Sequence, residues 1–289
     1  MITSALNPKE TLDEALTSAL GQRPQRRSPL YGGCVAQVYR LDMVDGSSLV
    51  AKWSPSGGLA VEGAMLSHLL EKTALPVPRA IYCSDILLIM EFVPNGGSLD
   101  AMGEEGAAEQ LAGLHQITAT AFGFEWDTVI GMLPQPNPWQ DNWAAFYRDQ
   151  RLLVMGRIAL NSGRIEKGLF GKLEKLCGKI DEFLPAHPKA SLTHGDIWSG
   201  NLLCRNGRVA AYIDPAIYFA DREVELAYLE FLSTFGAAFF ERYHALFPID
   251  PDYREARRDL YQIFPLLVHC QICGGGYPPQ TEAIIDRYI

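Results

Sequence analysis

The sequence lacks an uninterrupted apolar run of the roughly 18 residues that a membrane-spanning helix needs. Its N-terminal segment also lacks the basic start and the apolar stretch of a secretory signal, since it reads MITSALNPKE. These absences argue against a membrane-embedded protein. We therefore expect a cytoplasmic protein with no membrane partner.

A surplus of basic residues is missing as well. Lysine and arginine number 25 against 34 aspartates and glutamates, which gives a formal net charge of -9. Binding to a phosphate backbone depends on clustered positive charge, so we expect no nucleic-acid partner. With 48% hydrophobic residues, the composition is that of a folded globular protein.

Cysteine is sparse, with six residues scattered over 289 positions. This spacing does not suggest a disulfide framework, and reduced thiols are expected. Cys270 and Cys273 have the spacing of a redox or zinc pair, but a second pair is missing and their neighbours are apolar. Packing in the core is the better interpretation of these two residues.

Two common phosphate-binding motifs are absent. The sequence has no Gly-x-x-x-x-Gly-Lys-Ser/Thr, which excludes the usual Walker loop. It has no Gly-x-Gly-x-x-Gly either, so any phosphate loop must be shorter than that of protein kinases.

The N-terminal third has the pattern of a small α+β lobe. Residues 8–20 predict a short amphipathic helix, and the basic residues 21–29 a connector. Two β-prone runs flank Asp45-Gly46, which is a strong hairpin signal. A helix around residues 61–70 and strands at 81–83 and 86–93 follow, and Pro94–Gly97 is a plausible linker.

The rest of the chain is mostly helical in pattern, with a strand-rich insertion at residues 192–214 that turns at Asn206-Gly207. Helices are predicted over residues 104–118, 141–160, 165–184, 221–235, 252–273 and 280–288. We therefore predict an α+β, protein-kinase-like two-lobed fold. Residues 1–93 would form a small β-rich nucleotide-binding lobe, and residues 94–289 a larger, mainly helical lobe with the catalytic and metal-binding loops.

Three polar side chains in the insertion carry the chemical signal. Asn201 follows Asp196 by five residues, and Asp214 follows Asn201 by thirteen, with the predicted hairpin between them. Phosphoryl transfer needs a carboxylate that orients the attacking hydroxyl and hard oxygen ligands for magnesium, and an Asp-x-x-x-x-Asn loop with a later Asp supplies them in kinases. Each residue alone could simply cap a turn. His194-x-Asp196 could also be half of a metal-hydrolase site, although further ligands are not evident.

The first lobe offers candidate phosphate- and nucleotide-binding groups. Gly32 and Gly33 lie before the first predicted strand, where backbone N–H groups could approach phosphate oxygens. Lys52 ends a Val-Ala-Lys strand and Glu62 lies in the next predicted helix, as a kinase lysine–glutamate pair would. A surface lysine and a favourable first-turn acid are the ordinary alternative. The backbone of Glu91 and Val93 is a candidate for adenine recognition.

His194-Gly-Asp-Ile-Trp-Ser-Gly-Asn201 followed by Asp214-Pro-Ala216 resembles the hallmark of the fructosamine and ketosamine 3-kinases, relatives of the aminoglycoside phosphotransferases. Agreement elsewhere extends over nearly the whole chain, in the segments Tyr31-Gly-Gly-Cys34, Pro76-Val-Pro-Arg79, Pro134-Gln-Pro-Asn137 and Gly274-Gly-Gly-Tyr277 and at Trp143, Phe146 and Arg151. Trp198-Ser199 is the most specific element.

The resemblance implies phosphorylation of the 3-hydroxyl of a ketoamine, with ATP and Mg²⁺. This reaction would destabilise the adduct and let the amine be recovered, which is deglycation repair. By position, Asp196 would accept the proton and Asn201 and Asp214 would bind magnesium. The ATP-binding set would comprise Gly32, Gly33, Cys34, Lys52, Glu62, Met90, Glu91, Phe92 and Val93. Trp198 could form a wall of the substrate pocket, because an apolar ring face suits a sugar or a cationic amine.

Alternatives remain open at this point. An aminoglycoside- or choline-like phosphotransferase would share the fold, and a silent nucleotide-binding regulator would share the binding residues. The sequence does not determine the sugar, the amine carrier, or whether the ketoamine is a small molecule or protein-bound. It also leaves open redox control through Cys34 and the choice between a monomer and a homodimer.

Overall fold

The structure is a computed structural model that describes residues 11–30 and 36–289. The chain divides into two compact units. Unit 1 comprises Met1–Gly106 and Ser199–Pro215, and unit 2 comprises Ala107–Trp198 and Ala216–Ile289.

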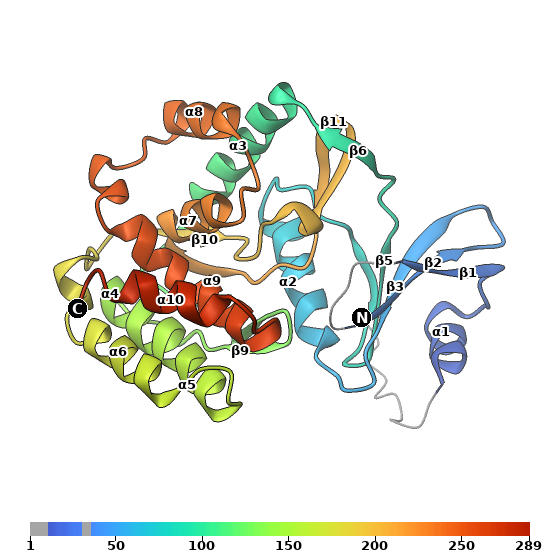
Figure 1. Ribbon diagram of the computed structural model, residues 1–289. Coiled ribbons are helices and arrows are strands. Elements are labelled where there is room, and N and C mark those ends of the chain that lie inside the picture. Colours follow the sequence, from blue (N-terminus) through green and yellow to red (C-terminus); the bar gives the residue numbers. More distant parts are fainter. Residues whose placement is uncertain (1–10, 31–35) are drawn as a thin grey trace. The chain divides into compact units, whose positions relative to one another are not determined.

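Unit 1 is built on a five-stranded antiparallel sheet with the order β1-β2-β3-β5-β4 (Figure 1). Its strands are β1 (Arg26–Leu30), β2 (Gln37–Asp42), β3 (Ser48–Trp53), β4 (Ala80–Cys83) and β5 (Leu87–Glu91). The turn between β2 and β3 contains Gly46 at φ 84°, a left-handed conformation that glycine adopts at little cost. The hairpin predicted around Asp45-Gly46 is therefore present.

The basic stretch before β2 differs from the prediction. Residues 26–30 form the edge strand β1, whereas the sequence predicted a connector over residues 21–29. Arg26, Arg27 and Pro29 are exposed on this strand. Charged residues and proline are common on edge strands because they discourage pairing with other chains, and this hides the strand signal in the sequence.

Helix α1 (Leu12–Leu20) packs on the sheet of unit 1 (Figure 1). It begins with a capping box in which Thr11 and Glu14 satisfy each other's backbone N–H groups, and it ends at Gly21 in the left-handed conformation. Ala15 and Leu16 are buried in a core cluster with residues of β2, β3 and β5. The helix predicted over residues 8–20 is therefore present within its described part.

The remaining elements of unit 1 are α2 (Leu59–Lys72), β6 (Gly96–Leu99), the first part of α3 (Ala101–His115), the 3-10 turn η3 (Ser199–Asn201) and β11 (Leu202–Tyr212). Asn206 and Gly207 in β11 have φ values of 51° and 77°, as in a two-residue hairpin turn. The Ile213 N–H donates to the Asn201 carbonyl at 3.1 Å. The chain therefore doubles back between η3 and Ile213.

Unit 2 is mainly helical. Its helices are α4 (Trp143–Phe146), the π-helix η1 (Tyr147–Leu152), α5 (Leu153–Asn161), α6 (Lys167–Cys177), η2 (Ile180–Glu182), α7 (Glu223–Phe231), α8 (Ala237–Leu246), η4 (Pro251–Arg254), α9 (Arg257–Ile272) and α10 (Tyr277–Ile285). Antiparallel strands pair as β12-β10-β7 and as β8-β9. Their bounds are β7 (Thr118–Ala119), β8 (Thr128–Ile130), β9 (Leu133–Gln135), β10 (Ala190–Thr193) and β12 (Tyr218–Asp221).

Several predicted helix limits were wrong in unit 2. The helix predicted over residues 221–235 begins two residues later, because Asp221 ends β12. The helix predicted over residues 252–273 is split into η4 and α9. Helix α8 was not predicted, since Phe239 and Tyr243 are its buried residues and a stripe this narrow gives a weak periodic signal.

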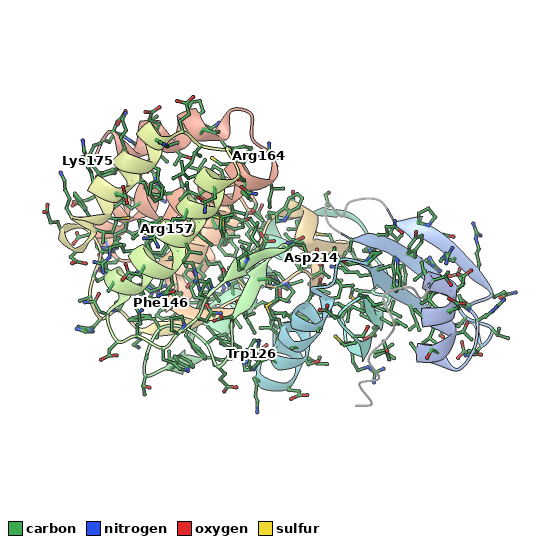
Figure 2. All side chains as sticks on the ribbon, turned by 90° about the horizontal axis from the view of Figure 1, so that it is seen from below. Trp126, Phe146, Arg157, Arg164, Lys175 and Asp214 are labelled. Carbon is green, nitrogen blue, oxygen red and sulfur yellow. The ribbon has the colours of Figure 1, made fainter. Side chains whose placement is uncertain are left out.

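The core of unit 2 is rich in aromatic side chains. Trp143 is fully buried, packs against Phe146 and Tyr147, and donates its indole N–H to the Tyr261 hydroxyl at 2.8 Å. Figure 2 shows side chains such as Arg157 and Lys175 on the outer faces of α5 and α6, while Phe146 lies inside. Of the helices in the described ranges, none is both long and apolar enough to cross a bilayer.

Replacing Leu16 by alanine tests the packing of α1. The Leu16 side chain is 1% exposed. Its removal from a packed core is expected to lower the free energy of unfolding by about 2–5 kcal/mol. Urea unfolding followed by circular dichroism measures the change. Ser18→Ala on the exposed face of the same helix is the control, and an equal loss in both variants would contradict packing through Leu16.

Candidate functional site

In unit 2, the loop that carries Asp196 leaves β10, the middle strand of its sheet. Gly195 has φ 86°, and a Cβ there would lie 2.2 Å from the Ala216 carbonyl oxygen. Any other residue would therefore clash with the backbone as well as suffer strain. The Ala216 N–H donates to the His194 carbonyl at 2.7 Å and fixes this approach.

The loop backbone is held by Glu225 of α7. One carboxylate oxygen accepts the Gly195 N–H at 2.5 Å, and the other accepts the His194 N–H at 3.2 Å. The second oxygen also contacts His115 Nε2 at 2.8 Å. Burial alone would raise the pKa of Glu225, but His115, His194 and the Gly195 N–H together lower it below its ordinary value. The carboxylate is therefore ionised and multiply hydrogen-bonded.

Asp196 itself is half-buried at the tip of this loop. Its Oδ1 accepts a hydrogen bond from the Tyr228 hydroxyl at 2.6 Å. Its backbone N–H donates to His194 Nδ1 at 3.3 Å. A carboxylate oriented in this way can accept a proton from a hydroxyl group placed against it.

The two residues after Asp196 have opposite environments. Ile197 is fully buried, and its carbonyl accepts the Thr234 hydroxyl at 3.3 Å. Trp198 is 38% exposed, unlike most large aromatic residues of the unit. Ile197 anchors the loop, and Trp198 is exposed beside it.

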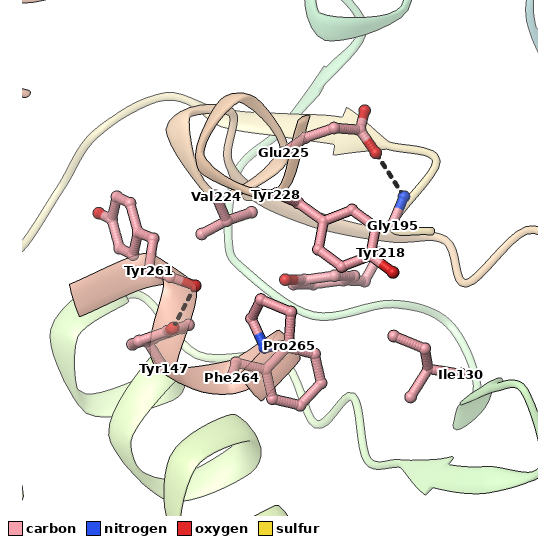
Figure 3. A pocket seen from close by; sticks show the side chains of 10 residues that line it. All are labelled: Ile130, Tyr147, Gly195, Tyr218, Val224, Glu225, Tyr228, Tyr261, Phe264 and Pro265. Atoms are coloured by element: carbon pink, nitrogen blue, oxygen red, sulfur yellow. Dashed lines mark hydrogen bonds between the residues drawn. The ribbon is translucent and has the colours of Figure 1, made fainter. Parts of the chain in front are cut away.

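A recess lies beside this loop (Figure 3). Its lining consists of Gly195 and Glu225 together with the apolar or aromatic residues Ile130, Tyr147, Tyr218, Val224, Tyr228, Tyr261, Phe264 and Pro265. The free space inside it is about 20 Å³. That volume suits about one water molecule, so the recess is part of the support of the loop and is too small for a sugar.

In unit 1, Lys52 of β3 lies between two carboxylates. Its ammonium group is 2.7 Å from Glu62 Oε1 of α2 and also forms an ion pair with Asp214 Oδ1. Burial opposes the charge on Lys52, but both acids outweigh it and the pKa of Lys52 is raised. Burial, together with repulsion from Asp214, raises the pKa of Glu62.

Asn201 and Asp214 lie on adjoining segments of unit 1, because the backbone N–H of Ile213 donates a hydrogen bond to the Asn201 carbonyl. Asp214, labelled in Figure 2, has φ 56°, which is unusual for a residue other than glycine. The amide oxygen of Asn201 and the carboxylate of Asp214 are hard ligands. The ammonium of Lys52 compensates only one of the two carboxylates beside it, so a net negative charge remains. The donor set therefore fits a hard divalent cation such as Mg²⁺.

The segment from Met90 to Val93 ends β5 in unit 1. Met90 is buried, and Phe92 lies under the Arg40 guanidinium, 4.4 Å from the ring centre. The Glu91 N–H already donates to the Arg79 carbonyl at 3.0 Å. The Val93 carbonyl accepts the Asn95 side chain at 3.0 Å. Gly32, Gly33 and Cys34, also predicted to bind ATP, lie outside the described residues.

Sequence reasoning missed Glu225 and Tyr228. The sequence predicts only a helix over residues 221–235 there and assigns neither residue to the site. A signal was available, because Glu225 and Tyr228 are three residues apart and share one helix face. Within the described ranges, no three His, Cys, Asp or Glu side chains gather as metal ligands, so a hydrolase site at His194 and Asp196 gains no support.

Comparison with known proteins gives consistent results. The family model described as Fructosamine kinase matches residues 8–289. A protein of Synechocystis named as a probable ketoamine kinase is 33% identical over 97% of this chain and 96% of its own length. The chloroplastic protein-ribulosamine 3-kinase of Arabidopsis thaliana is 31% identical over 89% of this chain and 81% of its own.

Solved structures show the same fold. A candidate fructosamine-3-kinase from Thermobifida fusca has a TM-score of 0.82 at 28% identity, covering 96% of this chain and 99% of its own. The aminoglycoside phosphotransferase APH(4)-Ia has a TM-score of 0.64 at 17% identity, covering 96% of this chain and 99% of its own. The predicted α+β, kinase-like fold class is therefore confirmed. The chain belongs to the fructosamine kinase family.

Proposed function

We propose that this protein is an ATP-dependent kinase that phosphorylates the 3-hydroxyl of ketoamines formed from sugars and amines. Family membership supports the reaction class, and the names of the Synechocystis and Arabidopsis relatives support the acceptor class. The observation that carries the proposal within the molecule is the buried Lys52 held by Glu62 and Asp214, because kinases use such a lysine on the nucleotide phosphates.

Unit 1 would bind the nucleotide. Lys52 would contact the α and β phosphates, and Glu62 would hold its side chain in place. Residues 90–93 would receive the adenine, with Gly32, Gly33 and Cys34 near the phosphates. An APH(4)-Ia structure of the same fold contains AMP-PNP, an ATP analogue. Asn201 and Asp214 would hold Mg²⁺, which when bound neutralises charge on the phosphate oxygens.

Asp196 would act on the acceptor. It lies five residues before Asn201, the spacing of a kinase catalytic loop. The 3-hydroxyl oxygen would attack the γ-phosphorus as its proton passes to Asp196, and the bond to the β,γ-bridging oxygen would break to release ADP. The exposed indole of Trp198 would contact the carbon face of the sugar or its amine.

Replacing Asp196 by asparagine tests the proton acceptor. The side chain keeps its size but cannot take a proton at neutral pH, so kcat for ketoamine phosphorylation is expected to fall on the order of 10²–10⁴-fold. ATP affinity, measured by calorimetry, should stay within about twofold of the wild-type value, because the change leaves the groups that bind ATP in the ground state in place. Asp181→Asn at an exposed site is the control. Unchanged turnover in Asp196→Asn would refute the role.

Replacing Lys52 by methionine tests the nucleotide site. Removing the charge is expected to lower kcat/KM for ATP on the order of 10²-fold, since phosphate stabilisation is lost. Lys72→Met at the exposed end of α2 is the matched control. Because the pKa of Lys52 is raised, the alkaline side of the wild-type pH–rate profile should show no ionisation of this lysine. Equal kinetics in the two variants would contradict the assignment.

A panel of acceptors tests the substrate class. Ribulosamine-lysine, fructosamine-lysine, erythrulosamine-lysine and two aminoglycosides are offered with ATP and magnesium, and ADP release is measured. Ketoamine-dependent turnover is expected, with ³¹P NMR locating the phosphate on the 3-oxygen. Turnover of aminoglycosides alone would instead support the other phosphotransferases of this fold, and ATP binding without any turnover would support a silent regulator.

A further inference from the structure

Tyr228 links the helix that supports the loop to the side chain of Asp196. Glu225 and Tyr228 lie three residues apart on α7 and face the same loop. Glu225 binds the loop backbone at Gly195, as the dashed line in Figure 3 shows, and the Tyr228 hydroxyl binds Asp196 Oδ1 at 2.6 Å. One helix therefore holds both the main chain of the loop and its carboxylate.

The Tyr228 ring is buried among other side chains. The residue is 7% exposed, and its ring lines the recess together with Tyr218 and Pro265 (Figure 3). The space left beside the ring in this recess is about 20 Å³, roughly the room of one water molecule. Burial raises the pKa of Tyr228 well above its ordinary value, and the nearby charge of Asp196 raises it further. The hydroxyl therefore stays protonated and donates.

We propose that Tyr228 is a positioning residue, which holds one oxygen of Asp196 and directs the other oxygen at the acceptor hydroxyl. This inference rests on the proposed role of Asp196 as proton acceptor. The terminal torsion of an aspartate is broad, so its carboxylate rotates readily unless a partner fixes it. An ionised carboxylate has two oxygens with about four acceptor positions, and the bond to Tyr228 uses one position on Oδ1.

A purely structural role for Tyr228 makes a different prediction. If the ring only fills the recess, phenylalanine should serve as well, because it keeps the ring and loses the hydroxyl. If the hydroxyl orients Asp196, the same change must act on catalysis while leaving the fold intact. Tyr228→Phe therefore separates the two roles.

Tyr147→Phe is the matched control. Tyr147 lines the same recess and is fully buried, but its hydroxyl donates to the backbone carbonyls of Leu260 and Tyr261 at 3.1 Å. Both variants lose one buried hydroxyl. The variants differ in that only Tyr228→Phe removes a hydrogen bond to Asp196.

Steady-state kinetics form the first readout. Tyr228→Phe is expected to lower kcat roughly tenfold, as for loss of a hydrogen bond to a charged group, with KM for ATP unchanged. Tyr147→Phe should keep kcat within about twofold, since it leaves Asp196 alone. Equal kcat in Tyr228→Phe and wild type would overturn the proposal.

The titration of Asp196 is the second readout and requires no substrate. A hydrogen bond donated to a carboxylate favours its ionised form, so without the hydroxyl the Asp196 ¹³Cγ titration midpoint should move up by about one pH unit. The acid limb of kcat should move the same way. Other titratable groups nearby are Glu225 and Tyr277, which act on Tyr228, and His194, whose Nδ1 accepts the Asp196 N–H.

The two readouts keep this inference distinct from the proposed function. Asp196→Asn identifies the ¹³C signal by its disappearance. A wild-type protein that turns over no ketoamine would defeat the proposed function, and the titration would still decide whether Tyr228 controls Asp196. An unmoved midpoint in Tyr228→Phe would overturn the proposal even if the wild type is an active ketoamine kinase.

Discussion

The buried charge of Glu225 is the constraint on which the Asp196 loop depends. An ionised carboxylate in the interior is costly unless hydrogen bonds replace its lost hydration. In this protein His115 and the N–H groups of His194 and Gly195 supply them. The loop must therefore present two successive N–H groups to one side chain, and the left-handed conformation of Gly195 accompanies that arrangement. The position of Asp196 follows from this backbone geometry.

Unit 1 also contains buried charge, and there acids and a lysine compensate one another. Lys52 is buried between Glu62 and Asp214, so the cation compensates the acids only in part. The remaining negative charge would be unfavourable in isolation, and it is the condition under which a hard cation binds well. Asp214 also has a left-handed backbone, a strained conformation that persists only where the surrounding structure holds it.

The sequence predicted what local signals encode. The fold class and the family were predicted correctly, because the hairpin at Asp45-Gly46, the periodic helices and the spacing around Asp196 are short-range patterns. The strand β1 and the helix α8 were missed, since exposed charges on one and a narrow apolar stripe on the other mask their periodicity. The spacing of Glu225 and Tyr228 places both on one helix face, but it does not identify the loop that they hold, because Gly195 is thirty residues away from Glu225.

The placement of Glu225 and Tyr228 on one helix has a mechanical consequence. Any shift of α7 displaces the loop backbone through Glu225 and the Asp196 carboxylate through Tyr228 at the same time. Leu226 and Leu229 of the same helix are fully buried, so the packing of the core sets the position of both contacts. Reaction rates are sensitive to misplacements of about 1 Å. Substitutions that leave cavities at Leu226 or Leu229 should therefore affect turnover as well as stability, although neither side chain would touch a reacting atom.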